Sequence, residues 1–141
     1  EVLKFMGDSV LAIFPVDPGL GPQPAVDAAI KAVRDATTRI EKGNAARREK
    51  GLVEIGFGIA LHHGNVVYGN IGAPDRLDFT VIGPAVNQTA RIEALCRTLS
   101  RPVLVSQRIA DAAQSELVSL GFQALRGVRE PQEIFTLPEY A

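Results

Sequence analysis

The sequence contains a single cysteine, no tryptophan and few other aromatic residues, with six phenylalanines and two tyrosines. A lone Cys96 excludes an internal disulfide, and no secretory signal pattern opens the chain, so a reducing, cytoplasmic setting is expected. RNA-binding sheets display aromatic side chains on which bases stack. With eight aromatic residues in the whole chain, the sequence argues against such a surface.

The sequence also has no excess of positive over negative charge and no long apolar run. The formal net charge is −1, which gives no basic surplus for attracting nucleic acid or an anionic membrane. No apolar run approaches the roughly 18 residues needed to span a bilayer. With 141 residues, 46% of them hydrophobic and 22% charged, the chain is expected to form one globular domain, in which any anionic ligand must be met by a local cluster of donors.

The first part of the sequence predicts a hairpin and then a helix. The runs "EVLKF" and "SVLAIFPV" flank Met6-Gly7-Asp8 and predict a tight β-hairpin with buried arms, because glycine permits the turn. After a Pro/Gly-rich loop, apolar residues recur from Ala25 at steps of three and four. This spacing predicts a helix that continues towards Gly43 and that the basic segment "AARREKG" can extend.

The middle of the sequence predicts strands. Residues 52–61, "LVEIGFGIAL", alternate between large apolar and small or charged residues, which predicts a strand packed on one face. The segment "NVVYGNIG" is interpreted as its hairpin partner. A polar turn and a strand over 77–82 follow.

The last part of the sequence alternates helices and strands. A helix is predicted to start with Pro84 in its first turn, followed by the strand "PVLVS", a helix capped by Ser106, and two strands around a glycine-centred turn. This order predicts an α+β fold with an antiparallel-rich sheet covered by helices.

Several residues are candidates for a functional site. Asp8 is either a turn residue that caps backbone N–H groups or a ligand for a hard cation such as Mg²⁺ or Mn²⁺. Asn87 and Arg91 lie four residues apart on the predicted helix and therefore share a face. Arg91 is either paired with a nearby glutamate, Glu54 or Glu93, or free to bind a phosphate.

The remaining candidates are basic. Lys4 stands among apolar residues of a strand, where its ammonium either snorkels to solvent or meets a polar acceptor. Arg126 and Arg129 flank Gly127 and are either merely exposed or placed to reach phosphate oxygens. His62 and His63 are adjacent on a strand, so their side chains point to opposite faces, cannot readily share a metal and are expected to have structural roles.

Four segments together resemble the catalytic domain of class III adenylate and guanylate cyclases. They are "KFMGDSVLAIF", "GIALHHGNVVYGNIG", "RLDFTVIGPAVNQTAR" and "RGVREPQEIFTL", in this order and spacing. The resemblance runs nearly end to end and is most specific from Arg76 to Glu93. It implies a ferredoxin-like sheet and head-to-tail homodimers with shared active sites. The implied reaction converts a nucleoside triphosphate to a 3',5'-cyclic monophosphate and pyrophosphate with two Mg²⁺ or Mn²⁺ ions.

The resemblance also implies roles for individual residues. Asp8 matches the second of two metal-binding aspartates, Asn87 the asparagine that orients the ribose, and Arg91 the arginine that stabilises the transition state. Lys4 matches the base-reading lysine, and Thr80 stands where many members carry a base-reading aspartate. A lysine and threonine pair suits adenine, because lysine donates to N1 and the threonine hydroxyl accepts from N6. ATP is therefore the expected substrate, and Arg126 is expected to contact its phosphates.

The family's segment that carries the first metal-binding aspartate has no counterpart in the sequence. Residues 1–141 are therefore expected to be the C-terminal portion of a cyclase domain whose first strand and first helices stand upstream. In the complete parent chain, a regulatory or sensor domain is the expected partner. A non-catalytic cyclase-homology module that dimerises and regulates an attached domain is the alternative.

Overall fold

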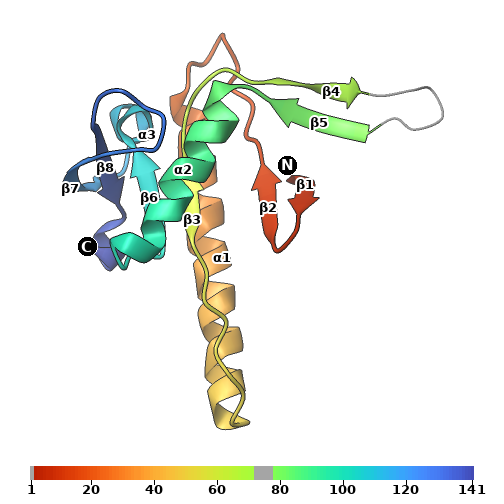
Figure 1. The fold of residues 1–141 in the computed structure, drawn as a ribbon, viewed down its shortest axis with the longest axis vertical. Coiled ribbons are helices and arrows are strands. Elements are labelled where there is room, and N and C mark those ends of the chain that lie inside the picture. The colour runs from red at the N-terminus through yellow and green to blue at the C-terminus, as the bar shows by residue number, and fades with distance from the viewer. Residues whose placement is uncertain (1, 72–77) are drawn as a thin grey trace.

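The computed structural model of the protein describes the backbone of residues 2–71 and 78–141, and the side chains in these ranges except those of residues 2–4, 6, 68, 70, 71 and 78–80. The predicted polar turn before the strand at 78–82 lies outside the described residues. Figure 1 shows a sheet with helices on both sides, a hairpin and a two-stranded arm beside it, and one helix that extends far beyond the sheet.

The elements confirm the predicted α+β architecture. In chain order they are β1 (Val2–Met6), β2 (Ser9–Ala12), α1 (Gln23–Glu49), β3 (Ile59–Leu61), β4 (Val67–Ile71), β5 (Asp78–Ile82), α2 (Pro84–Thr98), β6 (Val103–Ser106), α3 (Gln107–Ala112), β7 (Val118–Gln123), β8 (Gln132–Thr136) and a short 3₁₀ helix (Pro138–Tyr140). No helix among the described residues is long and apolar enough to cross a membrane.

The largest sheet has four strands in the order β3-β6-β8-β7. Strand β6 runs parallel to β3, with Ile59 opposite Val103, and antiparallel to β8. Successive side chains of a strand point to opposite faces. In β6, Val103 and Val105 pack with apolar residues of α1 and α3, and Leu104 packs with apolar residues of α2. The sheet therefore has α1 and α3 on one face and α2 on the other.

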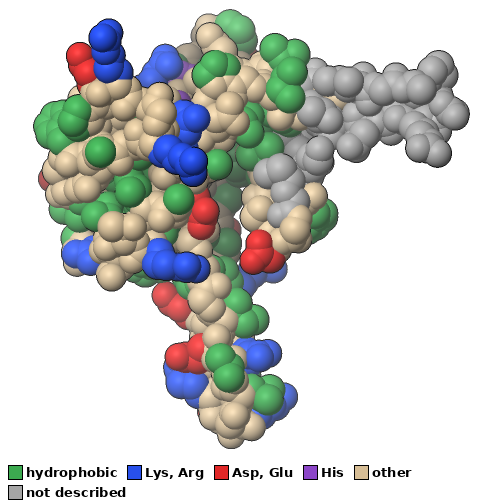
Figure 2. Space-filling model, in the orientation of Figure 1, with side chains coloured by type: hydrophobic (Ala, Val, Ile, Leu, Met, Phe, Trp, Pro, Cys, Tyr) green, Lys and Arg blue, Asp and Glu red, His purple; other side chains and the backbone are tan. Residues whose placement is uncertain are grey.

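Helix α1 is longer than the sheet it covers. Its buried residues recur at helical spacing and all lie in its first half: Val26, Ala29, Ile30, Val33 and Thr37. The second half leaves the body, and Figure 2 shows charged side chains of both signs gathered at that end. The predicted extension through "AARREKG" is confirmed, because the helix continues to Glu49.

The predicted strand over 52–61 is wrong for most of its length, since only Ile59–Leu61 form a strand. The preceding segment runs back along α1 and is held by side chains of that helix. The Asn44 side chain donates to the carbonyl of Ile55 at 2.9 Å and accepts from its N–H at 2.7 Å. Val53 is 82% exposed, so its alternating pattern does not mark a buried face here.

The hairpin partner predicted for this strand is also wrong. Strand β4 pairs with β5, with Val67 opposite Ile82, and not with β3. Strand β3 pairs instead with β6, whose residues lie 44 positions further along the chain than their partners, and that pairing is parallel. A parallel pair needs a long crossover, which α2 supplies.

The N-terminal hairpin forms as predicted, but its arms are more exposed than the sequence indicates. Phe5 lies opposite Val10, and the two side chains are 75% and 54% exposed. Cross-strand partners share a face of the hairpin. No described residue covers this apolar face enough to bury it.

Candidate active site

Helix α2 presents one face to the sheet and a second face away from it. Ala85, Ile92 and Cys96 are buried against the sheet. Asn87 is exposed and Arg91 half-buried, and their four-residue spacing puts them on one face beside the buried stripe, as predicted. Pro84 stands in the first turn, where a missing N–H leaves no bond unmade.

The guanidinium of Arg91 lies against the turn between β7 and β8. A Cβ built on Gly127 would lie 3.2 Å from Arg91 Nη2, 3.3 Å from Cζ and 3.5 Å from Nη1, so the three nearest atoms all belong to the guanidinium. Gly127 has φ +77°, a conformation that favours glycine. A side chain at position 127 would therefore require the guanidinium to move by a few tenths of an ångström.

The turn is fixed to the core beneath it. Leu125 is 4% exposed and packs with Ile92 of α2, and the N–H of Val128 donates to the Leu125 carbonyl at 3.0 Å. Arg126 and Arg129 flank Gly127 and are exposed. The predicted phosphate-binding candidates Arg91 and Arg126 are thus brought to the same region by the packing of α2 against this turn.

Arg91 is not paired with a glutamate. Glu54 forms an ion pair with Arg48, and no ion pair joins Arg91 to Glu93 or to any other carboxylate in the described part of the chain. The alternative in which Glu54 or Glu93 neutralises Arg91 is therefore wrong. Arg91, Arg126 and Arg129 put three guanidinium groups at or near one turn, and guanidinium groups are good partners for phosphate oxygens.

Asp8 occupies the tip of the hairpin between β1 and β2. Met6 pairs with Ser9, which leaves Gly7 and Asp8 as a two-residue turn, and Gly7 takes φ +60°. Asp8 is exposed and makes no hydrogen bond or ion pair with another described residue. A free carboxylate on a short turn can act as one oxygen ligand of a hard cation.

The described residues contain no group of three or more acidic, histidine or cysteine side chains that could hold a metal ion. Magnesium in nucleotide sites is commonly bound by one or two carboxylates together with phosphate oxygens and waters. Asp8 therefore fits as one ligand of such a site, with the remaining ligands coming from elsewhere.

The backbones of Lys4 and Thr80 belong to two strands that contact each other. Lys4 of β1 pairs with Leu11, Thr80 of β5 pairs with Gly69, and β1 lies against β5. The side chains of Lys4 and Thr80 lie outside the described part of the structure. Their roles stay predictions.

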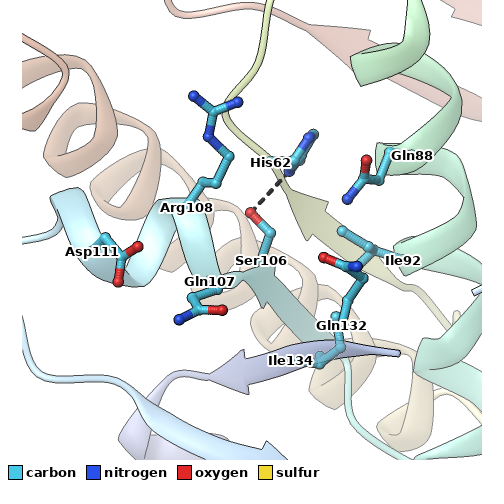
Figure 3. Close-up of a pocket in the computed structure, with 9 residues that line it drawn as sticks. All are labelled: His62, Gln88, Ile92, Ser106, Gln107, Arg108, Asp111, Gln132 and Ile134. Atoms are coloured by element: carbon cyan, nitrogen blue, oxygen red, sulfur yellow. Dashed lines mark hydrogen bonds between the residues drawn. The ribbon is translucent and has the colours of Figure 1, made fainter. Parts of the chain in front are cut away.

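The two adjacent histidines occupy different cavities. His62 Nδ1 lies 2.9 Å from Ser106 Oγ at the end of the sheet (Figure 3). His63 lines a second cavity with Pro22 and Ala112. Ser106 stands at the N-cap position of α3 but makes no side-chain capping bond, because its hydroxyl pairs with His62.

Burial of His62, and then the positive charge of Arg108, lower the pKa of His62 from 6.5 to about 4. The folded protein therefore keeps a neutral imidazole under conditions where the unfolded chain takes up a proton. The neutral His62 imidazole therefore contributes its full stabilisation of the folded state above about pH 6.5, and this contribution is lost as the pH falls towards 4.

We expect the free energy of unfolding to fall across this window, but by less than the roughly 1.4 kcal/mol per pH unit of one fully shielded proton site, because His62 is only partly buried and solvent screens its charge. Urea unfolding of His62→Gln, which can still bond to Ser106, should show a smaller loss over the same window. His63→Gln is the control and should keep most of the wild-type dependence, because the charge of His63 is the smallest of the three causes of the lowered pKa of His62. An unchanged slope in His62→Gln would contradict the assignment.

Sequence reasoning missed the contact between Gly127 and Arg91 and the pairing of His62 with Ser106. Both depend on elements that are distant in the chain. The only sequence signal was that Gly127 stands between two arginines and that His62 follows directly after a strand.

Comparison with known proteins adds to this geometry. No protein family model matches the chain. An adenylate cyclase from Anabaena cylindrica is 34% identical over 110 residues, which cover 75% of this chain and 20% of that protein. The chain spans about a fifth of the length of the curated relatives it matches.

Solved structures resemble nearly the whole chain. A bacterial light-regulated adenylyl cyclase matches with a TM-score of 0.77 at 30% identity, covering 99% of this chain and 39% of that chain. The guanylyl cyclase Cya2 matches with a TM-score of 0.75 at 26% identity, covering 96% of this chain and 68% of that chain. The arrangement of sheet and helices described above is thus that of these enzymes.

Proposed function

Since this chain has the fold of the nucleotide cyclases, we propose that it is the C-terminal portion of a class III cyclase domain. In the complete protein this domain converts ATP to 3',5'-cyclic AMP and pyrophosphate. The observation that supports this best is the guanidinium of Arg91, which has no carboxylate partner among the described residues and lies against the turn in which Arg126 precedes Gly127.

The reaction is an intramolecular phosphoryl transfer. The ribose 3'-oxygen bonds to the α-phosphorus, the bond from that phosphorus to the pyrophosphate oxygen breaks, and the hydroxyl proton leaves to a base or to water. Negative charge spreads over the phosphoryl oxygens in the transition state, so catalysis depends on positioning and on neutralising charge. Arg91 supplies a planar bidentate donor for that charge, and Asn87, four residues earlier, is on the same face to hold the ribose.

Two Mg²⁺ or Mn²⁺ ions would polarise the phosphates and lower the pKa of the attacking hydroxyl. In this chain Asp8 would be one oxygen ligand. The exposed hairpin tip leaves its carboxylate free for this role.

Lys4 and Thr80 are proposed to read adenine. Contact between their strands supports a shared role for the two residues. Lysine donates to N1 and threonine accepts from N6.

A second protomer is proposed to complete the site. The paired Val67 and Ile82 on the arm are 64% and 50% exposed, and an exposed apolar surface on a projecting arm supports a contact with another chain. A regulatory or sensor domain in the parent chain would control the activity.

The test is an assay of the full-length parent protein with ATP and with GTP, each in Mg²⁺ and in Mn²⁺, with detection of cyclic product by chromatography. We expect cyclic AMP from ATP and little product from GTP. Preferential turnover of GTP would contradict the base assignment. Absence of any cyclic product would favour the non-catalytic cyclase-homology module instead.

Gly127 is predicted to position Arg91, and a pair of glycine variants can test this. In Gly127→Ala the new Cβ would push the guanidinium by a few tenths of an ångström, and we expect the cyclisation rate to fall by roughly threefold to tenfold, because small misplacements of a catalytic group are costly. Gly121→Ala is the matched control. Gly121 also has a positive φ, +85°, but a Cβ there meets nothing within 4 Å.

Both variants carry the same kind of backbone strain, so a difference in rate reports the contact with Arg91. In an Arg91→Ala background, Gly127→Ala should have no further effect on the rate. Equal rates in the two glycine variants would contradict the positioning role.

A further inference from the structure

The carboxyl ends of the parallel strands β3 and β6 open onto a crevice. From β3 the chain continues through the arm into α2 on one face of the sheet, and from β6 it continues into α3 on the other face. Where neighbouring parallel strands send their connections to opposite faces, a crevice forms outside their carboxyl ends, and ligands commonly bind there. His62 follows the end of β3, and Ser106 ends β6.

A cavity of about 460 Å³ occupies this crevice. Its volume lies within the roughly 300–1,000 Å³ range of small-molecule sites. Ile92 of α2 and Ile134 of β8 supply apolar surface, and the polar lining comes from α2, α3, β6, β8 and the residue after β3 (Figure 3). The polar lining residues are His62, Gln88, Ser106, Gln107, Arg108, Asp111 and Gln132.

The polar groups of this cavity are available to a ligand. Arg108 has no ion pair or hydrogen bond with another residue in the described ranges. The Gln132 amide nitrogen donates to the Glu130 carbonyl at 3.1 Å, which leaves its oxygen free. Gln88 comes from the facing helix α2, so amide groups from two sides of the cavity can bond to one molecule.

The charge of the lining limits what can bind. Among the described residues that line the cavity, Arg108 is the single arginine, Asp111 is the single carboxylate and there is no lysine. A polyanion such as a nucleoside triphosphate would lack sufficient positive charge. One guanidinium matches one carboxylate in a bidentate pair, and the amides, hydroxyl and imidazole match hydroxyl or carbonyl groups.

We propose that this crevice binds a small polar carboxylate, such as a hydroxy acid, with its carboxylate on Arg108 and its oxygens bonded to Gln88 and Gln132. The site is separate from the proposed cyclase site, because α2 turns Gln88 and Ile92 into the cavity while Asn87 and Arg91 lie on its neighbouring face. The inference does not rest on the proposed cyclase function.

NMR titration of the protein that contains this chain can test the inference, with lactate as the hydroxy-carboxylate probe and inorganic phosphate and glycerol as comparisons. We expect saturable shifts of the His62 ring and Arg108 side-chain resonances with lactate in the millimolar range. Arg108→Gln should weaken lactate binding by roughly tenfold, as expected for loss of a charge-assisted bond. Arg97→Gln is the control. It removes an exposed arginine of α2 that does not line the cavity, and it should leave binding unchanged.

Gln88→Glu provides a second measurement, because it places a negative charge opposite the bound carboxylate and should also weaken binding. The inference is overturned if lactate causes no saturable shift, or if Arg108→Gln and Arg97→Gln bind it equally. Tighter binding of phosphate than of lactate would overturn the carboxylate assignment, and equal shifts with glycerol would show that the charge of Arg108 plays no part.

Discussion

Replacement of Arg91 by alanine in the full-length parent is expected to lower the rate of cyclic AMP formation by about 10³-fold or more, the size of effect that phosphoryl-stabilising arginines produce. The guanidinium is fixed between helix α2 and the Gly127 turn, and it has no carboxylate partner among the described residues. Its positive charge is therefore available to the transition state. Steady-state assays with ATP would measure kcat and KM separately.

The split between these constants separates two roles of Arg91. A group that acts only in the transition state lowers kcat with little change in KM, whereas a loss confined to KM would indicate ground-state binding and contradict the catalytic role. Arg91→Lys should recover only part of the rate, because an ammonium cannot form the planar bidentate pair. Arg97→Ala, an exposed arginine on the last turn of the same helix, is the control and should retain the wild-type rate.

Local features of the sequence predicted the parts of the fold that depend on local interactions. Pro84 as a first-turn residue predicted the start of helix α2, which forms from Pro84 to Thr98. Met6-Gly7-Asp8 predicted the hairpin turn, and Gly7 has the positive φ that such a turn needs. The formation of this helix and this turn depends mainly on residues within the same short segment.

The errors all concern contacts between distant parts of the chain. The alternation in residues 52–61 is equally consistent with a strand and with an extended segment, and the side chains of Asn44 and Arg47 bond to the backbone of Ile55 and Val53, which favours the latter. The parallel pairing of Ile59 with Val103 depends on where α2 packs. Sequence patterns read within a short window contain neither fact.

In the candidate site, too, the sequence predicted the local features but not the contacts between distant residues. The spacing of Asn87 and Arg91 placed both on one helical face, and the structure bears this out. Contact of Gly127 with the Arg91 guanidinium required Leu125 to be buried against Ile92, which brings the β7–β8 turn to α2. A pattern of single residues could not predict that approach, because it depends on the packing of two side chains, Ile92 and Leu125, that are 33 positions apart in the chain.

Removal of the carboxylate at Asp8 is expected to abolish metal-dependent cyclisation without unfolding the protein. Asp8→Asn is the sharper variant, since asparagine keeps the turn propensity and shape but loses the negative charge that a hard cation needs. Asp8 makes no bond with another described residue, so stability should change little. Thermal unfolding would check the fold, and cyclic AMP formation over a Mn²⁺ titration would check the activity.

A metal ligand and a structural turn residue give different results in this experiment. If Asp8 binds metal, any residual activity of Asp8→Asn should require a much higher Mn²⁺ concentration than the wild type. Asp35→Asn, an exposed aspartate on α1, is the control and should show the wild-type metal dependence. A carboxylate that only shapes the hairpin turn should not alter the metal requirement. Unchanged turnover in Asp8→Asn would therefore exclude the metal role, and the turn geometry alone would then explain Asp8.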